Sequence, residues 1–286
     1  MKKILYVVIA VSIAISCTEE KKPVQKVSNP KKVISTNKVV LSSEIEWQKL
    51  NPARGDKSPL AGTVWGDRKD TVATGFLAKF VDGFSSPPHI HNVTYRAVVI
   101  KGLIHNDDPN AAAMWMPQGS FWTQPAGESH ITSAKGKENI AYVEIDSGPY
   151  LVKPIDKAFE NGERPVNIDA SNVVWVTSEA TNWISVESNA QISFLWKSNN
   201  NDGLQGFFVK LPKQFTGEIV SDGEIFHAIL VQGELHYTLP QNRDVKILDP
   251  GSYFTATDEA IHRVVNETND DSILYIRTNG DIKVKY

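Results

Sequence analysis

Two histidines lie one residue apart in the segment PPHIHNVTYR, residues 87–96, directly after a pair of prolines. In a β-strand, residues i and i+2 point to the same face, so His89 and His91 can both point into the interior of a sheet. Imidazoles in this arrangement can bind a metal ion if the fold brings a third donor from a distant part of the chain. The alternative is a pair of polar residues on a solvated strand.

The segments around these histidines have the composition of β-strands. After Val39 the sequence consists of short runs rich in β-branched and aromatic residues, separated by Gly, Pro, Asn and Asp. Examples are TGFLAKF, TYRAVVIKG, ENIAYVEI, GFFVKLP and SILYIRT. No segment has a convincing helical period over three turns, which predicts an all-β protein.

The chain also repeats itself at a nearly constant offset. The offset is 131 residues for the pairs Trp65 and Trp196, Gly75 and Gly206, Gly102 and Gly233, and His105 and His236. It becomes 132 for Gly119 and Gly251 and for His130 and His262. Such a repeat indicates two copies of one structural unit. We place them at residues 38–157 and 158–286, joined near the polar connector DKAFENGERPVN, residues 156–167.

The first copy contains two motifs with fixed spacing, GX5HXHX3YX6G and GX5PXGX2H. These resemble the two signature motifs of the cupin superfamily. The matching positions are Gly83, His89, His91, Gly102, Gly119, Pro125, Gly127 and His130. The departures are Tyr95, where the family has Glu, and Ala134, where it has Asn. Nearly all of residues 39–286 also resemble a group of double-cupin proteins without an assigned activity.

This resemblance implies a bicupin, with two tandem jelly-roll β-barrels. Closure of the first barrel would then bring His130 beside His89 and His91 as the third metal ligand. Three imidazoles suit a divalent ion and leave coordination positions open. We expect iron or zinc, with manganese, nickel and copper as alternatives. The remaining alternative is a cluster of hydrogen-bonded histidines without metal.

Tyr95 is the predicted catalytic residue. A phenol has an ordinary pKa near ~10, so Tyr95 is expected to be a neutral hydrogen-bond donor beside the metal, with coordination as a phenolate as the alternative. A three-histidine cupin centre resembles those of non-haem iron dioxygenases that cleave thiols or β-diketones. The resemblance therefore implies a dioxygenase acting on a small organic molecule. A sensor or binding module that holds a small ligand without turnover is the rival hypothesis.

Further residues can be assigned around this site. His105, Trp122 and Gln124 are candidates for contacting the ligands or lining the pocket. Packing in the barrel core is the alternative for Trp122 and Gln124, and packing or a hydrogen bond is the favoured alternative for His105, because it recurs as His236 where the metal ligands do not. In the second copy, Val220, Asp222 and Phe226 stand where the first has His89, His91 and Tyr95, and only His262 persists. We therefore expect this copy to lack a metal site, unless Glu224 and His227 substitute after a register shift.

The N-terminal residues have the pattern of a targeting segment. Residues 1–17 combine MKK, an apolar run and Cys17, and Ala14–Cys17 resembles the lipobox of bacterial lipoproteins. This predicts lipidation at Cys17, a flexible tether over residues 18–37, and a location in the bacterial cell envelope with the lipid as sole membrane contact. An ordinary secretory signal is the alternative. A net charge of −3 without clustered Lys or Arg argues against nucleic-acid binding. A homodimer is an expected form for a cupin.

Overall fold

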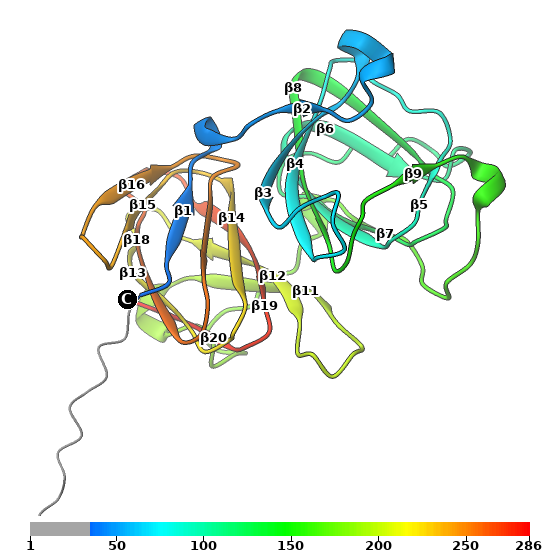
Figure 1. Cartoon of the computed structure of the whole chain (residues 1–286). Helices are drawn as coiled ribbons and strands as arrows, with labels where there is room; N and C mark the ends of the chain where they lie inside the picture. The colour runs from blue at the N-terminus through cyan, green and yellow to red at the C-terminus, as the bar shows by residue number, and fades with distance from the viewer. Residues whose placement is uncertain (1–34) are drawn as a thin grey trace, which may run out of the picture. The chain divides into compact units, whose positions relative to one another are not determined.

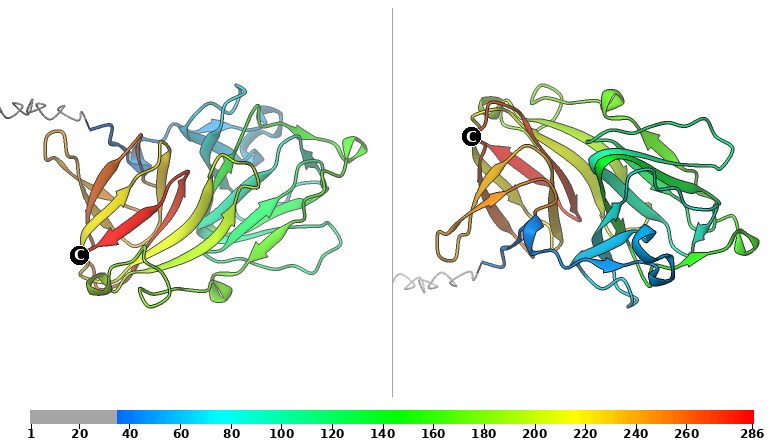
Figure 2. Two further views of the ribbon diagram at one scale, coloured as in Figure 1. Left: turned by 90° about the horizontal axis from the view of Figure 1, so that it is seen from below. Right: turned by 90° about the horizontal axis from the view of Figure 1, so that it is seen from above.

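The computed structural model describes residues 35–286, which form two β-barrels side by side (Figures 1 and 2). The predicted all-β fold of two tandem cupin barrels is confirmed. The predicted signal segment, Cys17 and most of the predicted tether lie outside the described residues. Within residues 35–286, no helix has the length and apolar character to cross a membrane.

The first barrel is built on a seven-stranded sheet. Its order is β10 (Val166–Ile168), β7 (Phe121–Gln124), β6 (Tyr95–Asp107), β8 (Ile131–Ile145), β4 (Thr74–Phe80), β3 (Leu60–Trp65) and β2 (Gln48–Lys49). The long strands β6 and β8 continue past irregularities between Val99 and Leu103, where their pairing shifts register. A two-stranded sheet of β5 (Ile90–His91) and β9 (Val152–Lys153) completes the barrel.

The second barrel has a six-stranded and a five-stranded sheet. The first has the order β1 (Lys38–Val40), β17 (Tyr253–Ala256), β14 (Phe226–Gln232), β19 (Ser272–Thr278), β12 (Gln205–Leu211) and β11 (Gln191–Lys197). The second has the order β16 (Val245–Leu248), β15 (Leu235–Thr238), β18 (Ala260–Val265), β13 (Thr216–Ser221) and β20 (Ile282–Lys285). Short 3₁₀ turns lie in the connections: η1 (Ser42–Glu44), η2 (Pro52–Lys57), η3 (Ile155–Lys157), η4 (Ala170–Asn172) and η5 (Val186–Ser188).

Strand pairing crosses the expected division at residue 157 twice. Strand β1 precedes the first barrel in the chain but pairs with β17 of the second, with Val39 opposite Phe254. Strand β10 follows that division but pairs with β7 of the first barrel. The predicted tether is also too long, because Asn37 is only 5% exposed and its Nδ2 donates to the Tyr237 hydroxyl at 2.6 Å. Each barrel therefore holds an edge strand that lies beyond its expected boundary.

Three apolar clusters explain why some strands lack a polar face. In β4, Phe76 and Ala78 face the interior of the first barrel, whereas Leu77 belongs to a cluster shared with Phe208 and Tyr275 of the second barrel. Because β4 is buried on both faces, its sequence is almost continuously apolar. Strand β18, by contrast, alternates between buried and exposed residues because one of its faces is solvated.

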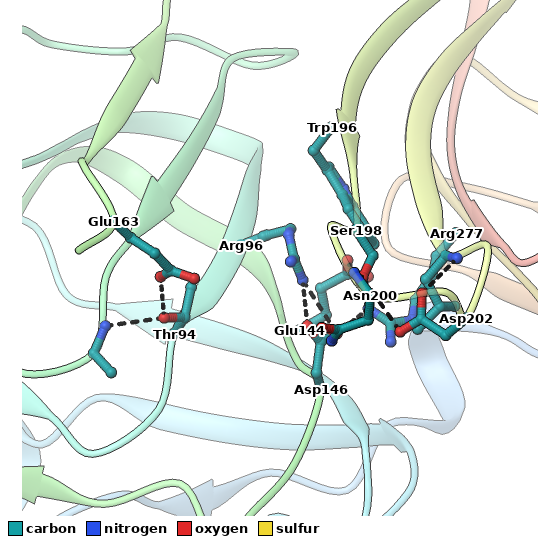
Figure 3. A network of polar contacts seen from close by, with 12 residues as sticks. Thr94, Arg96, Glu144, Asp146, Glu163, Trp196, Ser198, Asn200, Asp202 and Arg277 are labelled. Atoms are coloured by element: carbon teal, nitrogen blue, oxygen red, sulfur yellow. Dashed lines mark hydrogen bonds and ion pairs between the residues drawn. The ribbon is translucent and has the colours of Figure 1, made fainter. Parts of the chain in front are cut away.

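Charged side chains also lie between the barrels (Figure 3). Arg277 of β19 is 2% exposed and contacts Glu144 at 3.3 Å and Asp146 at 2.7 Å. Arg96 of β6 contacts the other oxygen of Asp146 at 3.0 Å and lies 3.7 Å above the ring of Trp196. Arg96 therefore lies away from the interior of the first barrel.

Candidate metal centre

The two cupin motifs meet through backbone hydrogen bonds. His89 and His130 form an isolated β-bridge, in which each N–H donates to the other residue's carbonyl at 3.0 Å. The Gly127 N–H donates to the His91 carbonyl at 2.8 Å. Gly127 has φ +78°, and a Cβ there would lie 2.3 Å from the Phe159 carbonyl oxygen. The second motif thus needs glycine at this position in order to hold His130 beside the first motif.

The three predicted ligands converge on one point. One nitrogen from each of His89, His91 and His130 lies within 4.8 Å of the others. Their ring centroids are 4.3 to 5.2 Å apart. His91 is 3% exposed and His130 is 1% exposed, whereas His89 is half-buried. Within residues 35–286, this is the one group of three or more His, Cys, Asp or Glu side chains with such spacing.

Hydrogen bonds set the orientation of two of the rings. His89 Nδ1 lies 2.9 Å from the Pro87 carbonyl, and His130 Nδ1 lies 3.2 Å from the Glu128 carbonyl. Because a carbonyl can only accept, each Nδ1 carries the proton and each Nε2 keeps a free lone pair. Such carbonyl contacts are the usual means of orienting metal-bound histidines.

Burial keeps these imidazoles neutral. Burial, together with a smaller effect of the neighbouring His89, lowers the pKa of His130 to about 3. Burial, followed by the proximity of His130 and His89, holds the pKa of His91 well below its usual value. Burial also lowers the pKa of His89. A histidine must be neutral to bind a metal ion, and burial keeps all three imidazoles in this state.

His91 differs from its two partners in its hydrogen bonding. Its Nδ1 is buried and makes no well-formed hydrogen bond within the described residues. Its Nε2 lies 3.2 Å from the Tyr150 hydroxyl, and the two rings stack with centroids 4.4 Å apart. A buried nitrogen without a partner carries a free-energy cost that ligation of an ion would remove. The donor set therefore fits a divalent metal ion.

Tyr95 belongs to a buried polar network around His130. Its hydroxyl lies 2.9 Å from Asn106 Oδ1 and 3.4 Å from His130 Nε2. Burial raises the pKa of Tyr95, so its phenol stays neutral at ordinary pH. The Trp122 indole N–H donates to the Tyr95 hydroxyl at 3.4 Å. Tyr95 is therefore held as a neutral hydroxyl at the edge of the triad.

Asn106 connects both sides of His130. Its Oδ1 also accepts from the Thr132 hydroxyl at 2.8 Å, and its Nδ2 donates to Gln124 Oε1 at 2.9 Å. Gln124 Nε2 in turn donates to the Glu128 carbonyl at 3.3 Å, the same oxygen that orients His130. Gln124 thus contacts the carbonyl that orients the metal ligand His130, and it does not line the cavity.

His105 agrees with the packing alternative and not with its candidate place at the ligands or in the pocket. Its Nδ1 lies 3.2 Å from the Met114 carbonyl, and its ring lies 5.9 Å from that of Trp115. Neighbouring strand residues point to opposite faces, so His105 points away from the face that Asn106 shares with Tyr95. His105 is a packing residue and neither contacts the ligands nor lines the pocket.

A cavity of about 600 Å³ opens onto the triad. Its wall is largely apolar, and His89, His91 and Tyr95 contribute polar groups together with a few others. The aromatic side chains that line it are Phe76, Phe80, Phe84, Trp122 and Tyr150. A mostly apolar pocket with a few polar groups is typical of sites for small organic molecules.

Three residues of this site were missed at the level of sequence. Tyr150 lies just before β9, whose pairing of Val152 with His91 carries it over the triad. Arg54 lies in the 3₁₀ turn η2, and Asn106 lies one position beyond His105 in β6. No motif marked these residues, because their place depends on contacts between segments that are distant in the chain. Asn106 could nevertheless have been considered, because it directly follows His105, a candidate pocket residue on a predicted strand.

The second barrel holds no equivalent group among its described residues. Burial lowers the pKa of His262 to about 3, and its ring stacks on Phe226 with centroids 4.1 Å apart. Asp222 and Glu224 are exposed, and His227 stacks against Trp65 of the first barrel at 4.1 Å. The interior of this barrel is filled by apolar side chains instead.

Several solved structures share this fold at low sequence identity. A candidate dioxygenase from Nostoc punctiforme has a TM-score of 0.66 and 13% identity, over 88% of this chain and 87% of that chain. Oxalate decarboxylase from Lactobacillus farciminis has a TM-score of 0.57 and 11% identity, over 89% and 88%. A variant of salicylate 1,2-dioxygenase from Pseudoaminobacter salicylatoxidans has a TM-score of 0.52 and 12% identity, over 78% and 77%. These values establish the cupin fold and no activity.

No curated protein matches the sequence. A family model described as a domain of unknown function, DUF4437, matches residues 38–285, which is nearly the whole of both barrels. The chain therefore belongs to the DUF4437 family.

Proposed function

We propose that this protein is a metal-dependent dioxygenase that acts on a small organic molecule in the first barrel. The observation that carries the proposal is the convergence of three neutral imidazoles on a largely apolar cavity of about 600 Å³. Dioxygen is the oxidant, and both of its atoms enter the product. The ion, with iron as the leading candidate, would supply redox chemistry and open coordination positions.

The residues of the chain would bind the ion, exclude water and hold the substrate. His89, His91 and His130 bind the ion, and the carbonyls of Pro87 and Glu128 fix two of their rings. The aromatic wall excludes water from the substrate. Tyr95 would turn its single O–H from Asn106 Oδ1 to a substrate oxygen, because burial keeps its hydroxyl protonated beside His130.

The comparisons support this proposal only at the level of fold. Proteins described as dioxygenases are among the similar structures, and so is an oxalate decarboxylase. The same architecture therefore serves more than one reaction, and the site has to decide between them. Tyr95 stands where many cupins have a carboxylate, so the donor set consists of three neutral histidines. Such a centre resembles those of the non-haem iron dioxygenases that cleave thiols or β-diketones.

Oxygen uptake by protein loaded with ferrous iron tests the proposal. With panels of small thiols, β-diketones, phenols and aryl carboxylates, we expect one class to cause oxygen consumption and to yield a product with both atoms of labelled dioxygen. His91→Ala should abolish uptake and keep the circular dichroism spectrum. If iron-loaded protein binds a compound and returns it unchanged after long incubation, the protein is a binding module or sensor.

We further propose that a lipid on Cys17 anchors the barrels to the bacterial envelope through a tether that ends before Asn37. The pattern of residues 1–17 supports this location. Detergent-phase partitioning of full-length protein expressed in a bacterium is the test. Wild type should enter the detergent phase and Cys17→Ser should not; equal partitioning of both would contradict the anchor.

A further inference from the structure

Within residues 35–286, the cavity beside the triad is lined by a single charged residue. Among its lining residues, Arg54 carries a positive charge and none is Asp or Glu. Imidazole binds a metal ion as a neutral ligand, so the three histidines would not offset the charge of a divalent ion. A ligand of this cavity would therefore meet an ion with two positive charges and a guanidinium, within a largely apolar wall that includes several aromatic side chains. This combination favours a ligand that is both anionic and apolar.

Arg54 is held in place by its own segment. The turn η2 begins at Pro52, and the side chain of Asn51 accepts a hydrogen bond from the Ala53 N–H at 3.2 Å. The Arg54 N–H donates to the Asn51 carbonyl at 3.0 Å. Its guanidinium carbon lies 5.2 Å above the ring of Phe84, itself a lining residue. The arginine is thus positioned by its turn and by an aromatic wall of the cavity.

The guanidinium is left without an acidic partner. No carboxylate of residues 35–286 lies within 4 Å of it, and the nearby Asp56 pairs with Lys49 at 3.1 Å. Among residues 35–286 its side chain makes one long hydrogen bond, from Nη2 to the Ser85 carbonyl at 3.5 Å. Most of its donors are therefore free for a ligand. A guanidinium has the geometry to bind both oxygens of a carboxylate.

We propose that the substrate of the first barrel is an aryl carboxylate, whose carboxylate binds Arg54 and whose ring lies against Phe76, Phe84 and Tyr150. This inference rests on the proposed function and names its substrate class. It assigns Arg54 the role of determining specificity for anions. The aromatic side chains would select an arene over a short aliphatic acid, because a larger apolar surface leaves water on binding.

Isothermal titration of purified full-length protein, as isolated and after iron loading, separates charge from apolar contact. The probes are 1-naphthoate, the neutral 1-naphthamide and acetate. We expect naphthoate to bind at least about tenfold more tightly than either of the other two, since a charge-assisted pair in a partly dry site contributes that much. Equal affinity for naphthoate and naphthamide in wild type would overturn the proposal.

Variants in one turn supply the matched controls. Arg54→Met should bring naphthoate and naphthamide to within about threefold of each other, and Arg54→Lys should keep part of the preference. Lys57→Met makes the same change of charge in the same turn, at an exposed residue that does not line the cavity, and should leave the preference intact. An unchanged preference in Arg54→Met, or its loss in Lys57→Met, would contradict a direct role for Arg54.

The two proposals fail differently. If naphthoate binds in an Arg54-dependent way but no aryl carboxylate causes oxygen uptake, the anion site is supported and the dioxygenase activity is contradicted. If a neutral compound causes oxygen uptake that Arg54→Met does not change, the dioxygenase activity is supported and the anion site is contradicted.

Discussion

Glu144 of the first barrel and Arg277 of the second occupy the same position in the two repeats, and they pair with each other. Glu144 lies opposite Gly75 in the sheet of the first barrel, and Arg277 lies opposite Gly206 in the second. Glu144 Oε1 and Arg277 Nη1 are 3.3 Å apart, with both side chains almost fully buried. The two repeats have thus diverged at one position into a complementary pair across their shared interface.

Loss of the arginine from this pair should destabilise the protein strongly. Arg277→Met leaves Glu144 buried without a cation, which costs about 3–5 kcal/mol. Adding Glu144→Gln should recover a large part of this loss, since the amide oxygen can still accept from the Tyr275 hydroxyl, now 2.7 Å from Glu144 Oε1. Urea unfolding of the two variants measures both effects. A double variant no more stable than Arg277→Met would show that packing, and not charge, causes the loss.

Tyr95→Phe should keep the metal and lose most of the activity. The ring is retained, but the hydroxyl beside His130 is removed. Loss of a preorganised donor at a reacting oxygen lowers turnover by about a hundredfold. Metal content and oxygen uptake, measured on the same preparation, separate the two effects. Loss of the ion in this variant would instead make Tyr95 a phenolate ligand.

His262 should make stability fall in mild acid. Burial lowers its pKa to about 3, whereas an unfolded histidine has a pKa near ~6.5. The unfolded chain therefore takes up the proton first, so this contribution to stability is complete above pH ~6.5 and is lost as the pH falls toward 3. From about pH 7.5 to 5.5 the loss is ~1.4 kcal/mol.

His262→Gln should reduce the pH dependence of the unfolding free energy by this amount. Tyr237→Phe is the matched control, since it removes the hydroxyl 2.8 Å from His262 Nδ1 and leaves the imidazole in place. It should retain the full dependence on pH. The same dependence in His262→Gln as in wild type would assign the acid sensitivity to other groups.

Two motif glycines should differ in their tolerance of alanine. Gly83 and Gly127 both have positive φ, +69° and +78°, so alanine at either costs about 1 kcal/mol in backbone conformation. A Cβ at Gly83 meets no atom within 4 Å, whereas at Gly127 it would meet the Phe159 carbonyl oxygen. Gly127→Ala should therefore lose clearly more unfolding free energy than Gly83→Ala. Equal losses would show that the loop before His130 can move aside.

The sequence was sufficient for the fold and for the triad. The spacing of His89 and His91 and the match to His130 depend on the strand period and on a motif, both of which are local patterns. Tyr150 and Arg54 could not be found in this way, because β9 and η2 reach the cavity through tertiary contacts. The pairing of β1 with the second barrel and of β10 with the first was not predicted for the same reason.

The place of His105 outside the pocket has a specific cause in strand β6. Tyr95, Ala97 and Val99 face the interior of the first barrel, and strict alternation would extend this face to His105. The register shifts between Val99 and Leu103 change the alternation, so that Ile104 faces inward instead. Asn106 then falls where His105 was expected.

The central claim is that His89, His91 and His130 together hold one divalent ion. Elemental analysis of wild type and His91→Asn, each purified without added metal and again after loading with ferrous iron or zinc, tests it directly. We expect about one ion per chain in wild type and less than about a tenth of an ion in His91→Asn, with the fold unchanged. A wild-type protein that retains no ion after loading, or equal retention by both proteins, would contradict the claim.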